Sequence, residues 1–290
     1  MTLISSLHPG VGNTRLHKLM FLLSNKQSRP VYDFVPYQYG CYSFQLQQDI
    51  RTLERQELIE QISGENGIEW KISEGVQNLP VRPDDKKLVK SICDEFGFFS
   101  RKELIQYTYR HYPYYAIKST IAKDYLNNEE LARIRIEEPS VSQTLLPVLF
   151  TIGYEGISLE TYINLLIRNN IHTLCDVRKN AYSMKFGFSL TQLKAACNGV
   201  NIQYVHIPEL GIESNLRKDL DIQIKRDDLF DHYEKELLPK NNEKIHSLID
   251  IVKSHQRVAI TCFEHDVCQC HRGRLAKVIA QREAIAVIHL

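Results

Sequence analysis

Short apolar runs alternate with helix-like segments throughout the second half of the chain. The apolar runs are Val148–Ile152, Thr173–Cys175, Ile202–Val205 and Val258–Cys262, with a last one at Ala284–His289. The helix-like segments lie near residues 158–169, 189–199, 214–254 and 272–283, and Pro239 divides the longest into two helices. Alternating strands and helices favour a mostly parallel sheet with right-handed crossovers. We therefore predict an α/β fold with a mostly parallel five-stranded sheet in the C-terminal half.

The first half of the chain predicts helices followed by a hairpin. Apolar side chains recur at helical spacing over residues 13–25, and Ser43 is a suitable N-cap for a second helix with one apolar face. The runs Ile59–Ile62 and Ile68–Ile72 flank turn residues, which indicates a β-hairpin. Helix, helix and hairpin in this order are typical of a winged helix, so we expect a mainly helical, winged-helix-like N-terminal domain.

A second helical block and a polar segment separate these two patterns. The block begins after the break at Pro80–Pro83 and contains a capping box that opens at Ser100. Residues 127–147 are first acidic and then contain serine and proline, so we place the domain boundary there. The predicted organisation is a winged-helix-like domain over residues 1–80, a helical extension and linker over 81–146, and an α/β domain over 147–290.

Composition and charge bear on the location of the protein and its partners. The 290 residues are 43% apolar and 24% charged, which is typical of globular proteins. No apolar stretch approaches the roughly 20 residues that span a bilayer, and a secretory signal is not visible, so we expect a cytoplasmic protein with no membrane partner. Seven cysteines without a regular framework agree with a reducing compartment. Because the net charge is only +1, any nucleic-acid binding depends on a local basic patch. The sequence does not decide between a monomer and a homodimer, so a homodimer is kept as an alternative.

Polar and thiol side chains follow the apolar runs of the C-terminal half. Because the carboxyl ends of parallel strands face one crevice, residues that are distant in sequence should converge there and form a catalytic site. The candidate catalytic residues are Glu155, Asp176, Arg178, His206, Glu209, Cys262, Glu264, Cys270, His271 and Arg272. The candidate ligand contacts are Gly153, Tyr154, Asn180 and Ser183.

Several of these candidates have two interpretations. Asp176 and Arg178 flank Val177 and should point to the same side of a strand, where they clamp a ligand or form a structural salt bridge. A partly dry crevice raises the pKa of a carboxyl group towards neutrality and makes it a general acid or base, whereas the same group elsewhere is a surface carboxylate. The residues in question are Glu155, Glu209 and Glu264. His206 is a catalyst or a packed histidine.

Three thiols and an imidazole lie close together near the C-terminus, at Cys262, Cys268, Cys270 and His271. Such a set can hold zinc or iron. Cys268 and Cys270 are closer than the usual C-x2-C spacing, so we predict no resident metal and keep that site as an alternative. A second alternative is a reactive thiol at Cys270. This residue lies where a loop meets a helix, and the N-terminus of a helix lowers the pKa of a thiol. Cys262 is equally a small buried apolar residue. Neither G-x-G-x-x-G nor a P-loop is present, so NAD and ATP are not supported.

The N-terminal half supplies candidate contacts to nucleic acid. Five tyrosines between residues 107 and 115 are interleaved with Arg110 and His111, where they stack on bases or belong to the core. The second helix of a winged helix normally enters the major groove. The candidate nucleic-acid contacts are Arg15, Lys18, Gln47, Arg51, Arg55 and Arg110. The alternative for these side chains is a solvated charged face.

The C-terminal half contains a series of ordered short motifs. They are Thr151–Gly156, Asp176–Asn180, Ser183, Gly187–Ser189, His206–Gly211, Cys262–Glu264, Cys270–Arg272 and Val287–His289. Over residues 148–290 these motifs resemble the domain-of-unknown-function family 488, and the resemblance implies a Rossmann-like fold but no settled reaction. Through Leu16–Leu23, Tyr37–Ser43 and Asp49–Ile59 the first half resembles the winged-helix modules often fused to such domains, which implies DNA binding or protein interaction.

The leading functional hypothesis is an enzyme that acts on nucleic acid or a nucleotide. It would catalyse hydrolysis or base removal in genome defence or repair, with DNA delivered by the winged helix. Arg178, His271 and Arg272 would hold a phosphate or a developing anion. Glu155 or Glu264 would activate water, because hydrolysis needs only a positioned base and charge stabilisation.

Two alternatives belong to other classes. The first is cysteine-dependent sulfur or phosphoryl transfer through Cys262 or Cys270, in a loop that resembles those of rhodaneses and cysteine phosphatases. The second is a non-catalytic regulator, in which the crevice senses a small ligand and the winged helix binds DNA.

Overall fold

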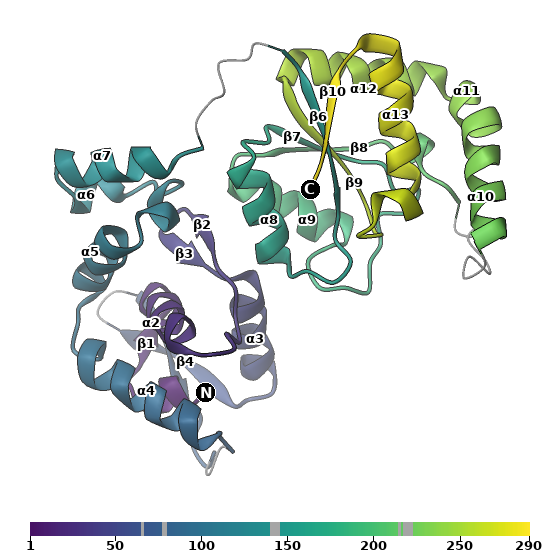
Figure 1. The fold of residues 1–290 in the computed structure, drawn as a ribbon. Coiled ribbons are helices and arrows are strands. Elements are labelled where there is room, and N and C mark those ends of the chain that lie inside the picture. The colour runs from purple at the N-terminus through teal and green to yellow at the C-terminus, as the bar shows by residue number, and fades with distance from the viewer. Residues whose placement is uncertain (65–66, 77–79, 140–145, 214–215, 217–222) are drawn as a thin grey trace. The chain divides into compact units, whose positions relative to one another are not determined.

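The computed structural model divides the chain into two compact units. Unit 1 is Met1–Glu138 and unit 2 is Pro139–Leu290. The structure describes all residues except 65–66, 77–79, 140–145, 214–215 and 217–222, so parts of the predicted linker and of the predicted helical segment 214–254 lie outside the described residues (Figure 1). Among the described residues, no helix has the length and apolar character needed to cross a bilayer.

Unit 1 begins with the predicted helices and hairpin (Figure 1). Its first elements are α1 (Thr2–Ser5), β1 (Val11–Gly12), α2 (Asn13–Lys26), β2 (Val35–Tyr37), β3 (Gly40–Tyr42), α3 (Phe44–Arg55), β4 (Ile59–Gly64) and β5 (Gly67–Ile72). β4 and β5 pair antiparallel, and β1 joins the other edge of β5. The hydroxyl of Ser43 accepts a hydrogen bond from the backbone N–H of Leu46 at 3.2 Å, so Ser43 caps α3 as predicted.

A helical block completes the core of unit 1. Its elements are α4 (Pro83–Phe96), α5 (Arg101–His111), η1 (Pro113–Ala116), α6 (Ala122–Tyr125) and α7 (Asn128–Glu137). Ser100 and Glu103 form the predicted capping box at the start of α5. Val89, Ile92 and Phe96 of α4 belong to one buried cluster with residues of α2 and α3.

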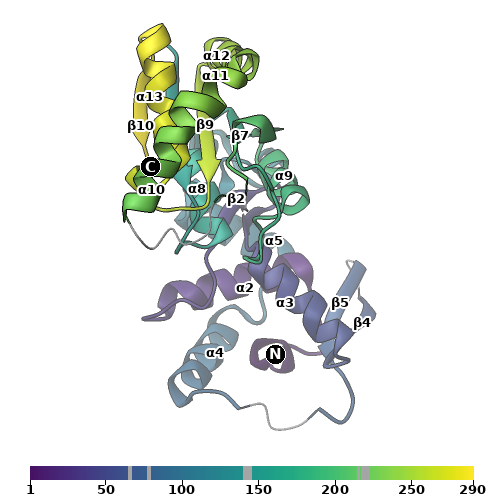
Figure 2. The same ribbon diagram turned by 90° about the vertical axis from the view of Figure 1, so that its right-hand side faces the viewer.

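Unit 2 is built on the predicted five-stranded parallel sheet. Its strands are β6 (Val148–Gly153), β7 (Thr173–Asp176), β8 (Gln203–His206), β9 (Arg257–Cys262) and β10 (Ala286–His289). All neighbouring strands are parallel, in the order β10-β6-β9-β7-β8. Figure 2 shows β10, β9 and β7 in this lateral order. The α/β prediction is confirmed.

Helices connect and cover the strands of unit 2 (Figure 1). They are α8 (Leu159–Arg168), α9 (Leu190–Gly199), η2 (Pro208–Leu210), α10 (Gln223–His232), the π-helical turn η4 (Tyr233–Leu237), α11 (Leu238–Lys240), α12 (Asn242–His255), η5 (Val267–Gln269) and α13 (His271–Glu283). The predicted long helical segment divides between α11 and α12, two residues after Pro239.

Alternate side chains of the strands face two different helical layers. Cys175, Val258 and Ile260 lie in the buried cluster that contains the apolar faces of α12 and α13. The side chain of Asp176 faces the other layer, since burial and then the charge of Asp176 raise the pKa of Cys197 in α9. The polar groups at the strand ends are therefore distributed over two faces of the sheet.

Candidate functional site

A buried ion pair lies at the end of β7. Asp176 ends that strand, is fully buried, and accepts hydrogen bonds from Nε of Arg178 at 2.8 and 3.0 Å. The backbone N–H of Arg178 donates to the same carboxylate at 3.1 Å, and the hydroxyl of Tyr204 donates at 2.6 Å. Of the two interpretations of Asp176 and Arg178, the structure shows the salt bridge. Asp176 holds Arg178 and Tyr204 in place, with its oxygens occupied by protein donors.

Arg178 in turn orders a stack of aromatic rings. Its Nη1 donates to the hydroxyl of Tyr154 at 2.8 Å and to the carbonyl of Phe188 at 2.8 Å. The rings of Tyr154 and Phe188 stack with centroids 4.3 Å apart and planes 9° apart. Burial alone would lower the pKa of Arg178, but Asp176 and Tyr154 raise it above its usual value, so the guanidinium stays charged.

An open pocket of about 560 Å³ adjoins this stack. Its lining combines basic, aromatic and amide or hydroxyl side chains from the strand ends and from the loop after β7. The lining residues are Tyr154, Arg178, Lys179, Asn180, Tyr182, Ser183, Met184, Lys185, Ile212 and Phe263. Of the predicted ligand contacts, Tyr154, Asn180 and Ser183 line the pocket. Lys179, Lys185, Tyr182 and Phe263 were missed, although they lie within or beside the same motifs.

Two lysines give this pocket its accessible positive charge. Lys185 donates from Nζ to the carbonyl of Tyr154 at 2.7 Å, and burial lowers its pKa while the nearby charge of Glu155 opposes that shift. Lys179 is exposed and lies 3.5 Å from a carboxylate oxygen of Glu213. Because Arg178 is paired with Asp176, a bound anion would meet mainly the two lysines.

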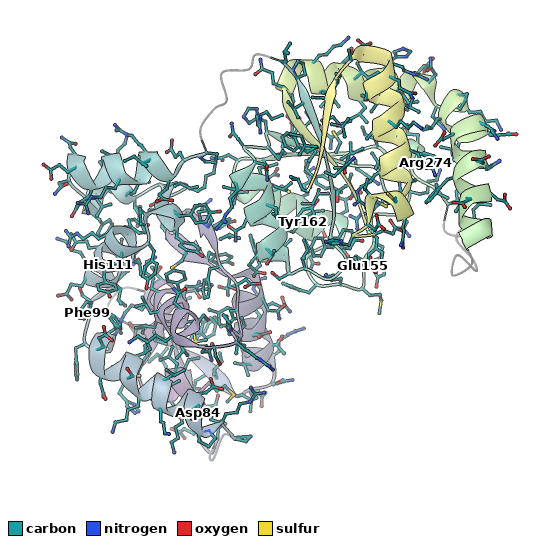
Figure 3. All side chains as sticks on the ribbon, in the orientation of Figure 1. Asp84, Phe99, His111, Glu155, Tyr162 and Arg274 are labelled. Atoms are coloured by element: carbon teal, nitrogen blue, oxygen red, sulfur yellow. The ribbon has the colours of Figure 1, made fainter. Side chains whose placement is uncertain are left out.

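Glu155 lies beside the same pocket. It follows Tyr154, is exposed, and accepts a hydrogen bond from the backbone N–H of His265 at 3.0 Å. Figure 3 labels Glu155 at the lower end of the sheet, beyond the end of β6. Its charge acts on Lys185, which lines the pocket. Of the three candidate acids and bases, Glu155 is the one that the structure places next to the pocket.

A second cluster joins two thiols to an imidazole. Cys262, Cys270 and His271 are all buried, and their sulfur and nitrogen ligand atoms lie within 4.8 Å of one another. Nδ1 of His271 is 3.5 Å from Sγ of Cys262 and 4.0 Å from Sγ of Cys270. The thiol of Cys262 also contacts a carboxylate oxygen of Glu264 at 3.2 Å. Burial, followed by the contact with Cys262, raises the pKa of Cys270, so this thiol is protonated at neutral pH.

Cys268 does not belong to that cluster. It is exposed in the loop before α13, whereas Cys270 is 1% exposed. The backbone turns between them, because Val267–Gln269 form a short 3-10 helix that ends at Cys270. Cys268 is therefore not part of the predicted four-residue metal site. Glu264 is a polar group beside the remaining residues Cys262, Cys270 and His271.

The sequence predicted that all these residues meet in one crevice, but the structure places them in two separate sites. Asp176 pairs in register with Thr261, so Cys262 is one residue further along β9 and points to the opposite face. Asp176 at the end of β7 and Arg178 just after it thus lie with α8 and α9, while the thiol of Cys262 in β9 lies with α13. The register between β7 and β9 determines this arrangement. Because Cys262 is offset by one residue from the partner of Asp176, its side chain points to the opposite face of the sheet.

Other predicted catalytic residues have structural contacts. The side chain of Arg272 is buried and donates to the carbonyls of Glu264 and His265, so it is not available to a phosphate. His206 donates from Nε2 to the carbonyl of Arg178 at 2.9 Å, which is a packing role. Glu209 forms an ion pair with Lys244 at 2.9 Å, and that hydrogen bond lowers the pKa of Glu209.

Gly153 serves backbone packing within the protein. A Cβ atom at this position would lie 1.9 Å from the carbonyl oxygen of Glu264. Gly153 was predicted as a ligand contact, but the group that approaches it closely is the protein backbone, where β6 meets the segment after β9.

The candidate nucleic-acid contacts of unit 1 divide into buried and exposed groups. Lys18 is fully buried and donates to the carbonyl of Tyr39 at 2.8 Å, so its prediction as a phosphate contact is wrong. Arg15 donates to the carbonyl of Gly97 at 2.7 Å and is partly buried. Arg110 is tied to Glu130 at 2.6 Å.

The remaining three candidates lie on α3. Arg51 and Arg55 are exposed, and Gln47 is partly exposed on the same helix. In the tyrosine stretch, Tyr109 is buried, and Tyr112 packs edge-on against Phe21. Of the six candidates, the structure therefore leaves Arg51 and Arg55 of α3 as exposed cations, with Asp49 and Glu54 on the same helix.

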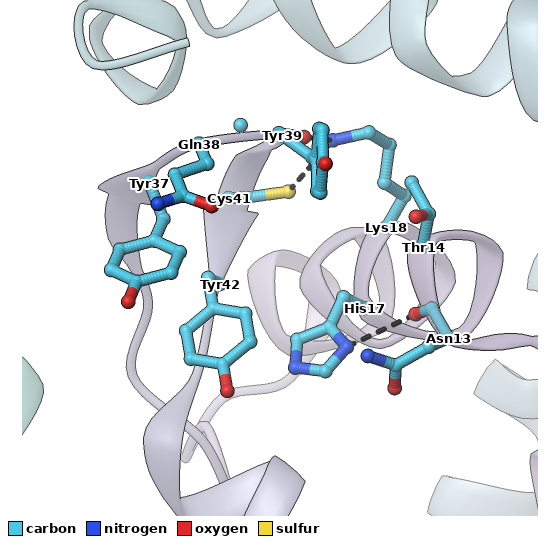
Figure 4. Close-up of a pocket in the computed structure, with 10 residues that line it drawn as sticks. Asn13, Thr14, His17, Lys18, Tyr37, Gln38, Tyr39, Cys41 and Tyr42 are labelled. Atoms are coloured by element: carbon cyan, nitrogen blue, oxygen red, sulfur yellow. Dashed lines mark hydrogen bonds between the residues drawn. The ribbon is translucent and has the colours of Figure 1, made fainter. Parts of the chain in front are cut away.

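Unit 1 also contains a small pocket that the sequence did not indicate (Figure 4). Its volume is about 160 Å³, and it is lined by α2 and by the β2–β3 ribbon. His17 stacks on Tyr42 with ring centroids 4.6 Å apart, and Tyr42 stacks on Tyr37 at 4.7 Å. Burial lowers the pKa of His17 to about 4. Nζ of Lys18 lies 3.8 Å from Sγ of Cys41 at the other side of this pocket.

Comparison with known proteins assigns a family to part of unit 2. The family model described as "Domain of unknown function DUF488" matches residues 158–279. This segment is a DUF488 domain. The match includes Asp176, Arg178 and the thiol–imidazole cluster, and it leaves the N-terminal region without a family assignment. No curated protein and no solved structure matches the chain.

Proposed function

We propose that unit 2 is a hydrolase that acts on a nucleotide unit of nucleic acid in the pocket beside Arg178. The observation that carries the proposal is the lining of that pocket, which combines Lys179 and Lys185 with Tyr182 and Phe263. Cationic groups neutralise phosphate, and aromatic faces stack on bases regardless of sequence. The pocket volume of about 560 Å³ lies within the range of about 300–1,000 Å³ common for small-molecule sites.

Glu155 is the proposed general base. Its carboxylate is held by the N–H of His265 and lies near the charge of Lys185. It would take a proton from water as the water oxygen attacks the sugar C1′ carbon, and the bond from C1′ to the base would break. The base leaves as an anion with the electron pair of that bond, and the proton that Glu155 took from water then passes to the base, which regenerates the carboxylate. Lys185 would stabilise the departing or phosphate anion.

The exposed arginines of α3 are the proposed contacts by which unit 1 binds the polynucleotide. Arg51 and Arg55 are exposed on this helix, which is the second of the helix–helix–hairpin arrangement. The second helix of such motifs normally enters the major groove. Unit 1 would supply affinity for DNA, and unit 2 would supply the reaction.

Product analysis on a panel of substrates tests this proposal. The full chain is incubated with modified and unmodified single- and double-stranded DNA and RNA, and mass spectrometry identifies released bases and strands. Glu155→Gln should lower kcat by about 100-fold or more, since general base catalysis contributes roughly 10²–10⁴. Glu243→Gln, an exposed carboxylate on α12, is the matched control and should keep full activity.

The same experiment distinguishes the alternatives. Ligand-dependent binding to one DNA sequence without any product would favour a regulator. Loss of activity after iodoacetamide treatment would favour thiol chemistry, but the burial of Cys262 and Cys270 argues against it. Activity that survives alkylation and depends on Glu155 supports the hydrolase.

A further inference from the structure

The thiol–imidazole cluster has the donor set of a metal site. Two sulfur atoms and one imidazole nitrogen come from Cys262 at the end of β9 and from Cys270 and His271 at the start of α13. All three residues are at most 2% exposed. Thiolate and imidazole together are ligands that select zinc among the common divalent ions.

His271 is oriented as metal-bound histidines are. Its Nε2 lies 3.1 Å from the carbonyl oxygen of Val177 and donates to it. A neutral imidazole that carries its proton on Nε2 has a lone pair on Nδ1, and this atom faces the two sulfur atoms. A backbone carbonyl that fixes the tautomer in this way is the usual outer partner of a ligating histidine.

The distances agree with tetrahedral coordination. Zinc–sulfur bonds of about 2.3 Å and zinc–nitrogen bonds of about 2.0–2.1 Å place sulfur and nitrogen about 3.5 Å apart in a tetrahedron. The measured distances from Nδ1 of His271 are 3.5 Å to Cys262 and 4.0 Å to Cys270. One carboxylate oxygen of Glu264 lies 3.2 Å from Sγ of Cys262, but Glu264 is outside the set of ligand atoms within 4.8 Å of one another, so its side chain has to rotate to become a fourth ligand.

A buried guanidinium supplies matching charge. Arg272 is 1% exposed, and its hydrogen bonds go to two backbone carbonyls. Within the described part of the chain, no carboxylate forms an ion pair with it. Two thiolates, one carboxylate and Zn²⁺ carry a net charge of about −1, which the guanidinium would neutralise; a buried unpaired charge is otherwise costly.

We propose that Cys262, Cys270 and His271 bind one zinc ion, and that the side chain of Glu264 rotates to supply the fourth ligand. Binding converts two thiols to thiolates and releases their two protons, so no oxidant or reductant is needed. The ion joins the end of β9 to the start of α13. It lies on the other face of the sheet from the nucleotide pocket, so the site stands apart from the proposed reaction.

Metal analysis of the untagged full chain, purified without chelators, tests the proposal. The wild type should contain about one zinc per chain. Cys270→Ser and His271→Asn should bind zinc at least about tenfold more weakly, as measured against a chromogenic chelator. Cys268→Ser is the matched control, because it removes an exposed thiol two residues from Cys270 and should retain the zinc.

Cobalt substitution provides a second readout that does not depend on the stability of the variants. The wild-type apoprotein titrated with Co²⁺ should show the visible bands of tetrahedral cobalt and a thiolate-to-cobalt charge-transfer band. The proposal is overturned if the wild type neither contains zinc nor binds Co²⁺ in this way. It is also overturned if a Cys262–Cys270 disulfide is found in the purified protein, or if Cys268→Ser loses the metal as Cys270→Ser does.

Discussion

Asp176 and Cys262 end neighbouring strands of one parallel sheet, yet their side chains lie on opposite faces. Asp176 is paired with Thr261 in the register of β7 and β9, and Cys262 is the next residue. Asp176 therefore binds Arg178 on the side of α8 and α9, while Cys262 meets His271 on the side of α13. Two chemically different clusters form where the sequence alone indicated one.

The ion pair on the first face should be essential for the stability of unit 2. In Asp176→Asn, Arg178 would stay buried without a compensating charge. Breaking a buried pair in this way costs about 3–5 kcal/mol, so the free energy of unfolding should fall by about that amount. Urea unfolding followed by circular dichroism measures it.

A surface pair in the same unit is the control for this variant. Lys253 and Glu283 are 2.7 Å apart with side chains 49% and 30% exposed. Exposed pairs contribute about 0–1 kcal/mol, so Glu283→Gln should change stability little. Equal effects of the two substitutions would mean that Asp176 does not compensate the charge of Arg178.

Much of the fold was accessible from the sequence because it depends on short-range patterns. The alternation of apolar runs and helical periods predicted the sheet, and the spacing of Asp176 and Arg178 predicted that the two side chains share one side. The register between β7 and β9 is a long-range property that the sequence does not encode locally. For that reason the opposite orientation of Cys262 was not foreseen.

Lys18 shows a second limit of the sequence pattern. A lysine on a helix is usually solvated, but the ribbon β2–β3 covers this one. Gly40 makes the cover possible, because a Cβ atom there would lie 2.7 Å from Nζ of Lys18 and 2.5 Å from the ring of Tyr109. Gly40 adopts φ +91°, which glycine tolerates best. This contact joins residues 22 positions apart, beyond any helical period.

The cysteines should differ sharply in reactivity. Burial raises the pKa of Cys175 to about 12 and also raises that of Cys197, whereas Cys268 is exposed. A disulfide reagent should therefore label Cys268 first in the native protein, and Cys175 and Cys197 only after denaturation. Mass spectrometry of quenched samples identifies the labelled residue. The fast labelling of Cys268 should disappear in Cys268→Ser; fast labelling of Cys175 or Cys197 in the native protein would contradict their burial.

Gly153→Ala should disturb both faces of the sheet. The new Cβ atom would meet the backbone carbonyl of Glu264 at 1.9 Å, so the segment after β9 has to move. Overpacking of this kind costs about 1–3 kcal/mol, and the effect should lie near the upper end because backbone cannot rotate away. Thermal and urea unfolding measure the loss.

Gly156→Ala is the comparison for that substitution. A Cβ atom at Gly156 would meet no described atom within 4 Å, but this residue has φ +77°. The expected cost is the strain of a left-handed residue, about 1 kcal/mol. If Gly156→Ala were the more damaging of the two, the contact between Gly153 and Glu264 would not be tight.

Unit 1 should lose stability in mild acid because of His17. Burial lowers the pKa of His17 to about 4 in the folded protein, while an unfolded histidine titrates near 6.5. Between these values the unfolded state binds more protons, so the free energy of unfolding rises with pH and is lost as pH falls from about 6.5 to 4. The full difference amounts to about 3 kcal/mol.

Urea unfolding at a series of pH values should show this slope in the wild type and a flatter one in His17→Gln. His111→Gln, which removes an exposed histidine of α5 instead, is the control variant. Parallel pH curves for the wild type and His17→Gln would mean that His17 is not held neutral in the fold.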